Sequence, residues 1–396
     1  MNVLHITDVP ACDNYTAGIV QKHLIEFLLK DGHTVTTIAI KDKNVFPEIP
    51  KHIADNVPYY VLEKPCESYG TRRYGNILSF VYNNYNALYI IPLLQRKIKE
   101  LCKGKHFDII WSVVQGQTMI KLIRGLAKQM DLPYSVEVWD PPQWWLSENR
   151  FDRFTFNSVM KEFGKLIHES QYCLAASDNM AEAYTNLYKG KCIPVIPSLN
   201  EDEEIIPIRS EADDEFIIGF AGQIYAINEF NTLIEALNLL NWQYKDRKIK
   251  VVLYGEYFSI RLSKAANVEL RGWRPQKEVL SSLAGMDLLY CPYWFSDDFS
   301  IISRLSFPSK LTTYLKTKTP VLVHAPEYAS SSQFISDGTN GYVCDTNIPD
   351  QIKEKLKNII DDSNKKSIGI AGYQLFRNKL VSSIMKNNFY ESLGIK

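Results

Sequence analysis

Residues 1–40, MNVLHITDVP ACDNYTAGIV QKHLIEFLLK DGHTVTTIAI, predict a strand, a loop, a helix and a second strand. Val3–Ile6 is an apolar run of the length of a buried strand, and a loop rich in Asp, Asn, Pro and Gly follows it up to Gly18. Apolar residues then recur at helical spacing, and Gly32 stops the helix before the β-branched run Thr34–Ile40. A strand–helix–strand unit with a short crossover implies a parallel sheet.

The same alternation continues along the chain and restarts in its second half, where a strand, a glycine loop and a helix again follow one another. We therefore expect an α/β protein of two doubly wound, Rossmann-like domains that face a cleft, with ligands at the carboxyl ends of the strands. A helix is expected at about 117–131 and another at 230–240. The further expected strands are Phe107–Trp111, Tyr134–Val138, Tyr172–Ala175, Ile193–Val195, Phe216–Phe220, Lys250–Tyr254, Val268–Leu270, Leu288–Tyr290 and Val321–Val323.

A linker separates the two halves, because residues 200–216 are acidic, contain proline and are poor in large apolar side chains. We expect an acceptor-binding domain over 1–205, a second domain over 206–375, and a C-terminal helix over 376–396 that packs toward the first domain.

Composition excludes several classes of protein. The 396 residues contain 45 Lys and Arg against 45 Asp and Glu, so the chain lacks the basic excess of a nucleic-acid-binding protein. With 45% hydrophobic residues it is not an acidic disordered chain. Seven dispersed cysteines indicate reduced thiols, and no Cys/His cluster has zinc spacing. The N-terminus does not resemble a signal peptide and no apolar run reaches about 18 residues, so we expect a cytoplasmic protein.

Two glycine loops and one helix start are candidate anion sites. Gly18 and Gly222 each follow the first strand of a half, where backbone N–H groups can approach an anion; ordinary tight turns are the alternative. Leu305–Leu315, LSFPSKLTTYL, is the most specific segment, with Ser309 as a helix N-cap and Lys310 in the first turn. A lysine there opposes the helix dipole, which suggests an anionic ligand unless its side chain points into water.

With these motifs the chain resembles GT-B glycosyltransferases of the retaining family 4 type, in particular a bacterial subgroup with F-P-S-K-L. The resemblance includes the Gly18 and Gly222 loops, the turn Leu270–Trp273, and the P-S-K-L helix followed by Pro320 and Val321. It implies a transferase that moves a sugar from a nucleoside diphosphate sugar to a glycan or lipid-linked acceptor in cell-surface polysaccharide assembly, with retention and without a metal or other cofactor.

The resemblance also assigns residues to the donor. The backbone around Ser309–Leu311 and Gly18 would hold the diphosphate, with Lys310 as a catalytic charge. Thr313 and Leu305 stand where relatives carry glutamates for the ribose and the sugar. The other donor-binding positions implied are Gly222, Gln223, Tyr225, Gly255, Gly272, Trp273 and Arg274.

The segment Glu137–Trp145, EVWDPPQWW, follows an expected strand and is the candidate acceptor site. Asp140 could orient or deprotonate an acceptor hydroxyl, and Trp139 and Trp144 could stack on sugar rings. The alternative is a rigid aromatic loop that Asp140 caps. Arg72 and Arg73 begin a tyrosine-rich stretch up to residue 94 that could meet a membrane or a lipid-linked acceptor, or could form a helical hairpin that covers the domain.

Other activities lack their motifs. No D-x-D of a metal-dependent GT-A enzyme, G-x-S-x-G elbow or P-loop is present. A non-catalytic GT-B relative stays open because Leu305 and Thr313 replace both glutamates. Another GT-B activity such as a nucleotide-sugar epimerase also stays open, although it would need acid and base groups beyond Asp140 and two histidines, His5 and His324, that are better explained as satisfied core residues. The oligomeric state is not predicted.

Overall fold

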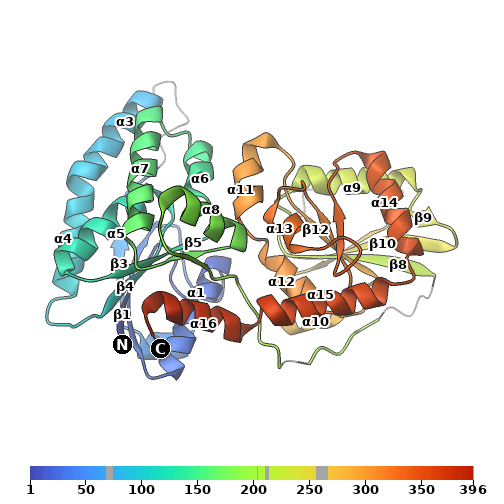
Figure 1. The fold of residues 1–396 in the computed structure, drawn as a ribbon, viewed down its shortest axis with the longest axis horizontal. Coiled ribbons are helices and arrows are strands. Elements are labelled where there is room, and N and C mark those ends of the chain that lie inside the picture. Colours follow the sequence, from blue (N-terminus) through green and yellow to red (C-terminus); the bar gives the residue numbers. More distant parts are fainter. Residues whose placement is uncertain (68–74, 203, 210–213, 256–265, 396) are drawn as a thin grey trace. The chain divides into compact units, whose positions relative to one another are not determined.

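The computed structural model describes residues 1–67, 75–202, 204–209, 214–255 and 266–395 (Figure 1). The chain forms two compact units, Met1–Val195 with Lys386–Lys396, and Ile196–Met385. Sequence analysis placed these divisions near residues 205 and 375. The first division lies earlier in the structure because Leu199 pairs with Val381, within the second unit.

The first unit is built on a seven-stranded sheet in the order β3-β2-β1-β4-β5-β6-β7, and every neighbouring pair is parallel. This confirms the parallel α/β sheet expected from the sequence. Strands β4, β5 and β6 are buried on both faces, as in other parallel sheets. The strands are β1 (Asn2–Thr7), β2 (Thr34–Lys41), β3 (Tyr59–Glu63), β4 (Ile109–Val113), β5 (Tyr134–Val138), β6 (Cys173–Ala175) and β7 (Cys192–Pro194).

Helices connect these strands and cover the sheet. They are α1 (Thr16–Lys30), α2 (Lys51–Asn56), α3 (Gly75–Tyr85), the π-helix η1 (Asn86–Ile90), α4 (Ile91–Leu101), α5 (Gly116–Met130), α6 (Pro142–Glu148), α7 (Arg153–Glu169), α8 (Asp178–Tyr188) and the end of α16 (Ser382–Leu393). In α16, Phe389 packs edge-on against Trp111 of β4 and the Ser392 carbonyl accepts a hydrogen bond from Ser135 of β5. The end of the C-terminal helix α16 therefore packs on the first unit.

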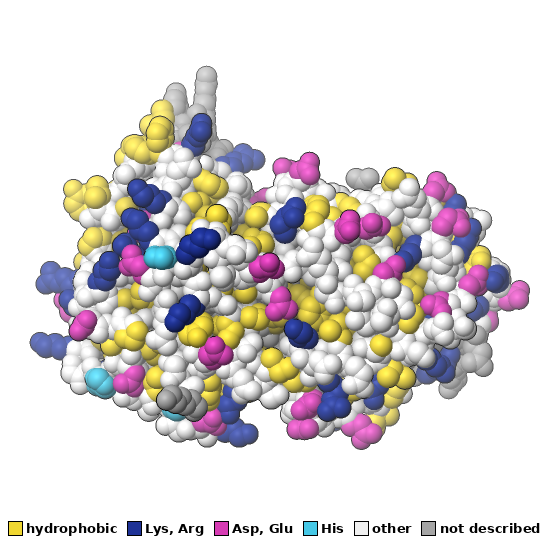
Figure 2. Space-filling model, viewed as in Figure 1, with side chains coloured by type: hydrophobic (Ala, Val, Ile, Leu, Met, Phe, Trp, Pro, Cys, Tyr) yellow, Lys and Arg dark blue, Asp and Glu magenta, His cyan; other side chains and the backbone are white. Residues whose placement is uncertain are grey.

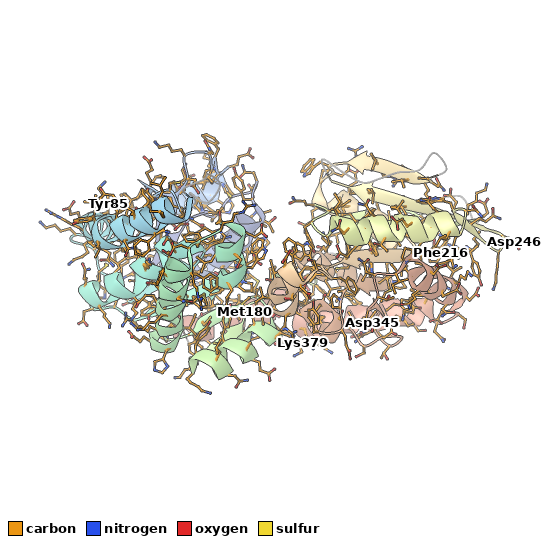
Figure 3. The ribbon with its side chains drawn as sticks, turned by 90° about the horizontal axis from the view of Figure 1, so that it is seen from above. Tyr85, Met180, Phe216, Asp246, Asp345 and Lys379 are labelled. Carbon is orange, nitrogen blue, oxygen red and sulfur yellow. The ribbon has the colours of Figure 1, made fainter. Side chains whose placement is uncertain are left out.

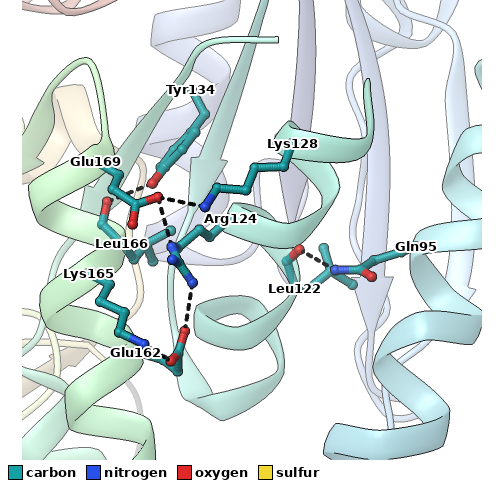
Figure 4. Close-up of polar contacts among 9 residues, drawn as sticks. All are labelled: Gln95, Leu122, Arg124, Lys128, Tyr134, Glu162, Lys165, Leu166 and Glu169. Atoms are coloured by element: carbon teal, nitrogen blue, oxygen red, sulfur yellow. Dashed lines mark hydrogen bonds and ion pairs between the residues drawn. The ribbon is translucent and has the colours of Figure 1, made fainter. Parts of the chain in front are cut away.

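A branched ion cluster joins α5 to α7 (Figure 4). The Arg124 guanidinium contacts Glu169 at 2.8 Å and Glu162 at 3.2 Å, and Lys128 and Lys165 extend the cluster at either end. Because the carboxylates are about one-third exposed, solvent screens the cluster, and it sets the position of the two helices more than their stability.

The second unit repeats the design with the order β11-β10-β8-β12-β13-β14, all parallel, and with β9 antiparallel to the outer side of β10. Figure 3 marks Phe216 at the start of β8 and Asp246 at the β9–β10 turn. The strands are β8 (Glu215–Ala221), β9 (Gln243–Tyr244), β10 (Arg247–Tyr254), β11 (Val268–Gly272), β12 (Leu288–Pro292), β13 (Val321–His324) and β14 (Tyr342–Cys344).

Two hydrophobic clusters stabilise this unit, one built around Phe216, Phe230 and Leu288 and the other around Leu289, Tyr314 and Phe376. The helices that supply them are α9 (Ile227–Leu239), α10 (Gln276–Ala284), α12 (Ser309–Lys316), α14 (Pro349–Asp361) and α15 (Lys365–Lys379). Three shorter helices complete the unit: the 3-10 helix η2 (Asp297–Phe299), α11 (Ser300–Leu305) and α13 (Ser330–Phe334).

Candidate functional site

Each sheet has one place where its strand order reverses. In the first sheet it lies between β1 and β4, and in the second between β8 and β12. Ligands of open α/β sheets bind in the crevice outside the carboxyl ends of the strands at such a point. The residues that follow these four strands are therefore the first candidates for a functional site.

Gly222, Gly255 and Gly272 lie at the carboxyl ends of the neighbouring strands β8, β10 and β11, and we call these three residues the glycine ladder. The Gly222 N–H donates to the Tyr254 carbonyl at 2.8 Å, and the Gly255 N–H donates to the Gly272 carbonyl at 3.0 Å. All three have positive φ values, which side chains with a Cβ rarely adopt. A Cβ added at Gly222 or Gly272 would meet no atom of the described residues within 4 Å, so these residues leave both positions open.

Lys310 lies directly on the first of these loops. Its ammonium donates to the Gln223 carbonyl at 2.8 Å and lies 4.0 Å from the centre of the Tyr225 ring and 4.4 Å from that of Phe220. Sequence analysis left open whether this side chain points into water; the structure places it against the Gly222 loop instead. The charge of Lys310 is thereby fixed at the switch point of the sheet.

Burial lowers the pKa of Lys310 from 10.5 to about 8, and the neighbouring Cys291 opposes this shift. The shift is the expected effect of moving an ammonium among aromatic rings, which disfavours its charged form. Among the described residues its hydrogen-bond partner is one neutral carbonyl. A bound anion beside Lys310 would therefore stabilise the charged form of its side chain.

The helix that carries Lys310 differs in detail from the prediction. Pro308, not Ser309, is the N-cap of α12, and no side chain caps this end. Leu311 is fully buried and its N–H bonds to the Pro308 carbonyl at 2.9 Å, which removes it from the expected diphosphate contacts. The N–H groups of Ser309 and Lys310 remain as the candidates in this first turn.

Tyr314 explains why α12 holds its position. Its hydroxyl accepts from the Ala221 N–H at 2.8 Å and approaches the Ala221 carbonyl at 3.3 Å, at the end of β8. Thr313, on the same helix, is half-buried, whereas Leu305 at the end of α11 is buried in the core. The apolar residue at position 305 therefore has a packing role.

A cluster of aromatic side chains lies at the loop that follows Gly222. Tyr225 packs on Trp294 with ring centres 4.9 Å apart, and Trp294 stacks on Phe299 at 5.1 Å. Beside them the buried Glu229 accepts the Phe295 N–H through Oε1, while its Oε2 has no hydrogen-bond partner among the described residues. The sequence predicts no role for Glu229, because its burial depends on the segment after β12, which lies 66 residues away.

His324 belongs to a buried network rather than to an open site. Its Nε2 lies 2.9 Å from the Thr346 carbonyl and its Nδ1 2.6 Å from the Tyr290 hydroxyl. Burial lowers its pKa to about 4, so it is neutral at pH 7. The carbonyl requires a proton on Nε2, which leaves Nδ1 to accept from Tyr290. His5 is likewise buried, stacked on Trp111 with ring centres 4.1 Å apart, so both histidines have the core role that was favoured.

Trp273 and Arg274 follow the third glycine of the ladder. The Trp273 side chain is 65% exposed, so its ring is available to a ligand. Arg274 donates to the Trp273 carbonyl at 2.9 Å and pairs with Glu278 at 3.4 Å, both at the surface. These contacts orient Arg274 beside the indole.

In the first unit, Glu137 at the end of β5 is the centre of the aromatic segment. Its two carboxylate oxygens accept the indole N–H groups of Trp111 at 3.1 Å and Trp139 at 2.8 Å. Burial raises the pKa of Glu137 to about 7, and the two indoles oppose the shift. The half-buried Asp140 follows, directly before Pro141, the N-cap residue of α6.

We expect Glu137→Gln to lower the free energy of unfolding by about 1–3 kcal/mol, because a glutamine has one acceptor oxygen for two buried indole donors. Urea unfolding followed by fluorescence measures this, with the exposed Glu148→Gln on α6 as the control. Because the pKa of Glu137 is raised in the folded state, its contribution to the free energy of unfolding is full below pH 4.5 and is lost as the pH rises through 7. The difference in stability between the parent and Glu137→Gln should therefore shrink at high pH. Equal stabilities of the two variants at pH 5 would contradict this role.

Trp144 of α6 is a candidate for a hydrogen bond to a ligand, because its buried indole N–H has no partner among the described residues. Arg72 and Arg73, predicted to meet an acceptor, lie outside the described residues.

Gly18 lies inside the first turn of α1, not in the preceding loop. A Cβ there would lie 2.7 Å from the Pro10 carbonyl and would collide with Cys12, so this glycine permits close packing of the loop on the helix.

At the switch point of the first sheet, the protein places its own carboxylate on a helix N-terminus. Glu67 Oε1 accepts the Thr118 N–H at 2.5 Å, in the first turn of α5. Lys64 lies 3.2 Å from the other oxygen of Glu67 and 3.3 Å from Asp8, and all three side chains are at most 12% exposed. An anion site of the kind found at such helix ends is therefore already filled in this unit.

Groups of three or more His, Cys, Asp or Glu side chains able to hold a metal ion do not occur in the described part of the chain. Within the same ranges, no helix has the length and apolarity needed to cross a membrane.

Comparison with known proteins matches a family model to most of the second unit. Residues 201–373 match the family model described as "Glycosyl transferases group 1", a segment that contains the glycine ladder and Lys310. No curated protein matches the sequence.

Solved structures resemble the chain over its whole length. Sucrose-phosphate synthase from Thermosynechococcus elongatus is 13% identical, with a TM-score of 0.69 and 99% of this chain and 98% of that chain covered. Anabaena HepE, solved with UDP, is 13% identical, with a TM-score of 0.66 and complete coverage of both chains. The lipopolysaccharide outer core galactosyltransferase WaaB is 12% identical, with a TM-score of 0.64 and coverage of 100% and 99%. At this identity the likeness shows the fold, which is the GT-B fold of two Rossmann-like domains.

Proposed function

We propose that this chain is a GT-B glycosyltransferase that moves a sugar from a nucleoside diphosphate sugar to a glycan or lipid-linked acceptor in cell-surface polysaccharide assembly. The observation that carries the proposal is the position of Lys310 on the Gly222 loop, at the switch point of the second sheet. This site lies inside the segment that matches the glycosyl transferases group 1 model. The similar fold of HepE has been solved with UDP and with UDP-glucose, and WaaB is named a galactosyltransferase.

The donor would bind along the carboxyl edge of the second sheet. The uncapped start of α12 offers N–H groups at the positive end of the helix dipole, and Lys310 adds a positive charge to them. Together they would stabilise the diphosphate as it leaves, so that we propose no metal for this step. The exposed Trp273 ring would flank the base, with Thr313 and the backbone at Gly255 and Gly272 near the ribose.

The acceptor would bind to the first unit at Glu137–Trp145. Asp140 would orient the attacking hydroxyl, and the Trp144 N–H would donate to a sugar oxygen. The filled helix end at Glu67 supports placing the donor phosphates in the second unit instead. We propose retention at the anomeric carbon, with the leaving diphosphate helping to accept the proton of the hydroxyl.

Turnover of nucleotide sugars tests this proposal. Purified protein is incubated with an acceptor extract of its source cells and with UDP-, GDP-, ADP-, dTDP- and CMP-sugars, with and without EDTA, and release of the nucleotide is measured by chromatography. We expect release from sugars of one diphosphate nucleotide only, unaffected by EDTA and reduced by about a hundredfold or more in Asp140→Asn. Loss of all release in EDTA would contradict the metal-free mechanism.

A non-catalytic binding protein is the second candidate, favoured by the buried Leu305 and by Thr313. It would bind a nucleotide sugar but release no nucleotide with any acceptor extract of its source cells. An affinity measurement beside the turnover assay separates the two functions.

Nucleotide affinity should depend on pH through Lys310. A bound diphosphate raises the pKa of this lysine, so binding is strongest below its ligand-free pKa of about 8. Above it the affinity should fall, by up to about tenfold per pH unit, because protonation must accompany binding. Calorimetry at several values between about pH 7 and 9.5 measures the change. In Lys310→Arg, whose side chain stays charged, this dependence should be absent, and a dependence that persists there would assign it to another group.

A further inference from the structure

The helical run α3–η1 carries two amide side chains inward and many apolar side chains outward. On the buried side, Asn83 accepts from Gln117 Nε2 at 2.5 Å and Asn86 donates to the Cys66 carbonyl at 3.4 Å. On the outer side the side chains of Ile77, Leu88 and Tyr89 are each more than 60% exposed. This is the reverse of the amphipathic pattern by which a surface helix of a globular protein packs on its core.

The exposed apolar residues form a continuous row. Ile77, Val81, Tyr85, Tyr89 and Leu93 recur every four residues, and Leu78 and Leu88 flank this row. We call these residues together the apolar ridge. In an α-helix four residues advance about 40° beyond a full turn, so a row at this spacing drifts around the axis. The π-helix η1 holds more residues per turn, which reduces the drift and keeps the row on one side.

Neighbouring elements widen the ridge. Phe154, the second residue of α7, is 77% exposed and contacts Phe80 of α3 with ring centres 6.0 Å apart. Tyr85 and Tyr89 pack on each other at 5.3 Å and have both an apolar ring and a polar hydroxyl. Figure 3 shows Tyr85 at the outer edge of the first unit, and in Figure 2 hydrophobic side chains project from the same edge.

Charge changes abruptly where the ridge ends. Residues 75–95 contain no charged side chain, whereas residues 96–105 contain five basic residues and one acidic residue, in a chain with equal numbers of both overall. The next position of the row is Lys97, and Arg96, Lys97 and Lys99 are exposed on α4. An apolar face with a basic flank is the pattern of helices that lie in the surface of an anionic membrane.

We propose that the apolar ridge docks on the surface of an anionic lipid bilayer, with the ridge at the boundary of headgroups and acyl chains and the basic flank on the headgroups. Tyrosine is a residue that prefers this boundary. A second copy of the chain would bring the same basic flank with it, whereas an anionic surface complements the charge. The inference concerns the first unit alone and does not depend on the proposed transfer reaction.

Co-sedimentation of the full chain with vesicles tests the inference. Vesicles of phosphatidylcholine with phosphatidylglycerol should bind the protein at low salt, and those of phosphatidylcholine alone should bind it much less. High salt should weaken the binding, because it screens the basic flank. The variant Tyr85→Ser/Leu88→Ser/Tyr89→Ser should bind at least about tenfold more weakly, since it removes apolar area from the boundary.

A control variant, Leu187→Ser/Leu239→Ser, removes exposed apolar residues elsewhere and should bind as the parent does. The ridge variant should keep the thermal midpoint of the parent, which shows that it is folded without relying on the proposed function. Absence of binding by the parent protein, or equal binding by the ridge variant, would overturn the inference. A parent dimer in sedimentation that the ridge variant converts to a monomer would also overturn it, and would assign the ridge to a second copy.

Discussion

Lys310→Met should weaken the binding of the preferred nucleoside diphosphate by about ten- to a hundredfold, which is the range of one hydrogen bond to a charged group. The ammonium lies within hydrogen-bonding distance of the Gly222 loop, and its neighbours are aromatic rings and a neutral carbonyl. A phosphate oxygen beside it would replace that carbonyl with a charged partner. Methionine keeps the length and the apolar contacts of the side chain but removes the charge.

The test is isothermal titration of the parent and variant, together with their thermal midpoints. Lys366→Met is a matched control, because Lys366 is also the second residue of a helix in the same unit but is exposed. This control should bind as the parent does. Equal affinities of Lys310→Met and the parent, with both folded, would remove Lys310 from the donor site.

Lys64→Met should lower the free energy of unfolding by about 3–5 kcal/mol at pH 7, because it leaves two buried carboxylates without their cation. Burial by itself would lower the pKa of Lys64, but Glu67 and Asp8 outweigh it and hold the pKa above its ordinary value. The same cluster fixes Glu67 on the N-terminus of α5, so the variant should also loosen the carboxyl edge of the first sheet.

Urea unfolding of parent and variant measures the loss. Lys43→Met, which removes an exposed ion pair with Glu63, is the control and should change the stability by less than about 1 kcal/mol. A loss no larger than that of Lys43→Met would show that the cluster is solvated and contributes little.

The fold could be predicted because its signals are local. Short β-branched runs separated by amphipathic helices gave the strands β1, β2, β5, β8 and β10 close to their observed bounds. The edge strands β3, β9 and β14 were not predicted. Each depends on a neighbour for its hydrogen bonds and has a weak pattern of its own, since β3 is only half-buried and β9 has two residues.

The site could be predicted only where a residue type and its place on a helix were informative together. Lys310 was predicted to be a site residue in this way, because a lysine in a first turn is unfavourable without an anion. Glu137, Glu229 and Glu67 were not assigned roles, since a carboxylate in a sequence gives no sign that it is buried. Each of them bonds to a group far away in the sequence, namely the Trp111 indole and the Phe295 and Thr118 N–H groups, which lie 26 to 66 residues from their glutamates. The sequence contained a signal of burial for Glu137 alone, because this glutamate lies inside the apolar strand Tyr134–Val138.

The most direct test of the central claim is a titration of the full chain with UDP, GDP, ADP, dTDP and CMP in the presence of EDTA. We predict saturable binding of one nucleoside diphosphate with a rise in thermal midpoint that follows ligand concentration, because the ligand binds only the folded state. The same ligand should bind Lys310→Met far more weakly. If none of these nucleotides binds the folded protein, with or without magnesium, the assignment of the second unit as a nucleotide-sugar site is wrong.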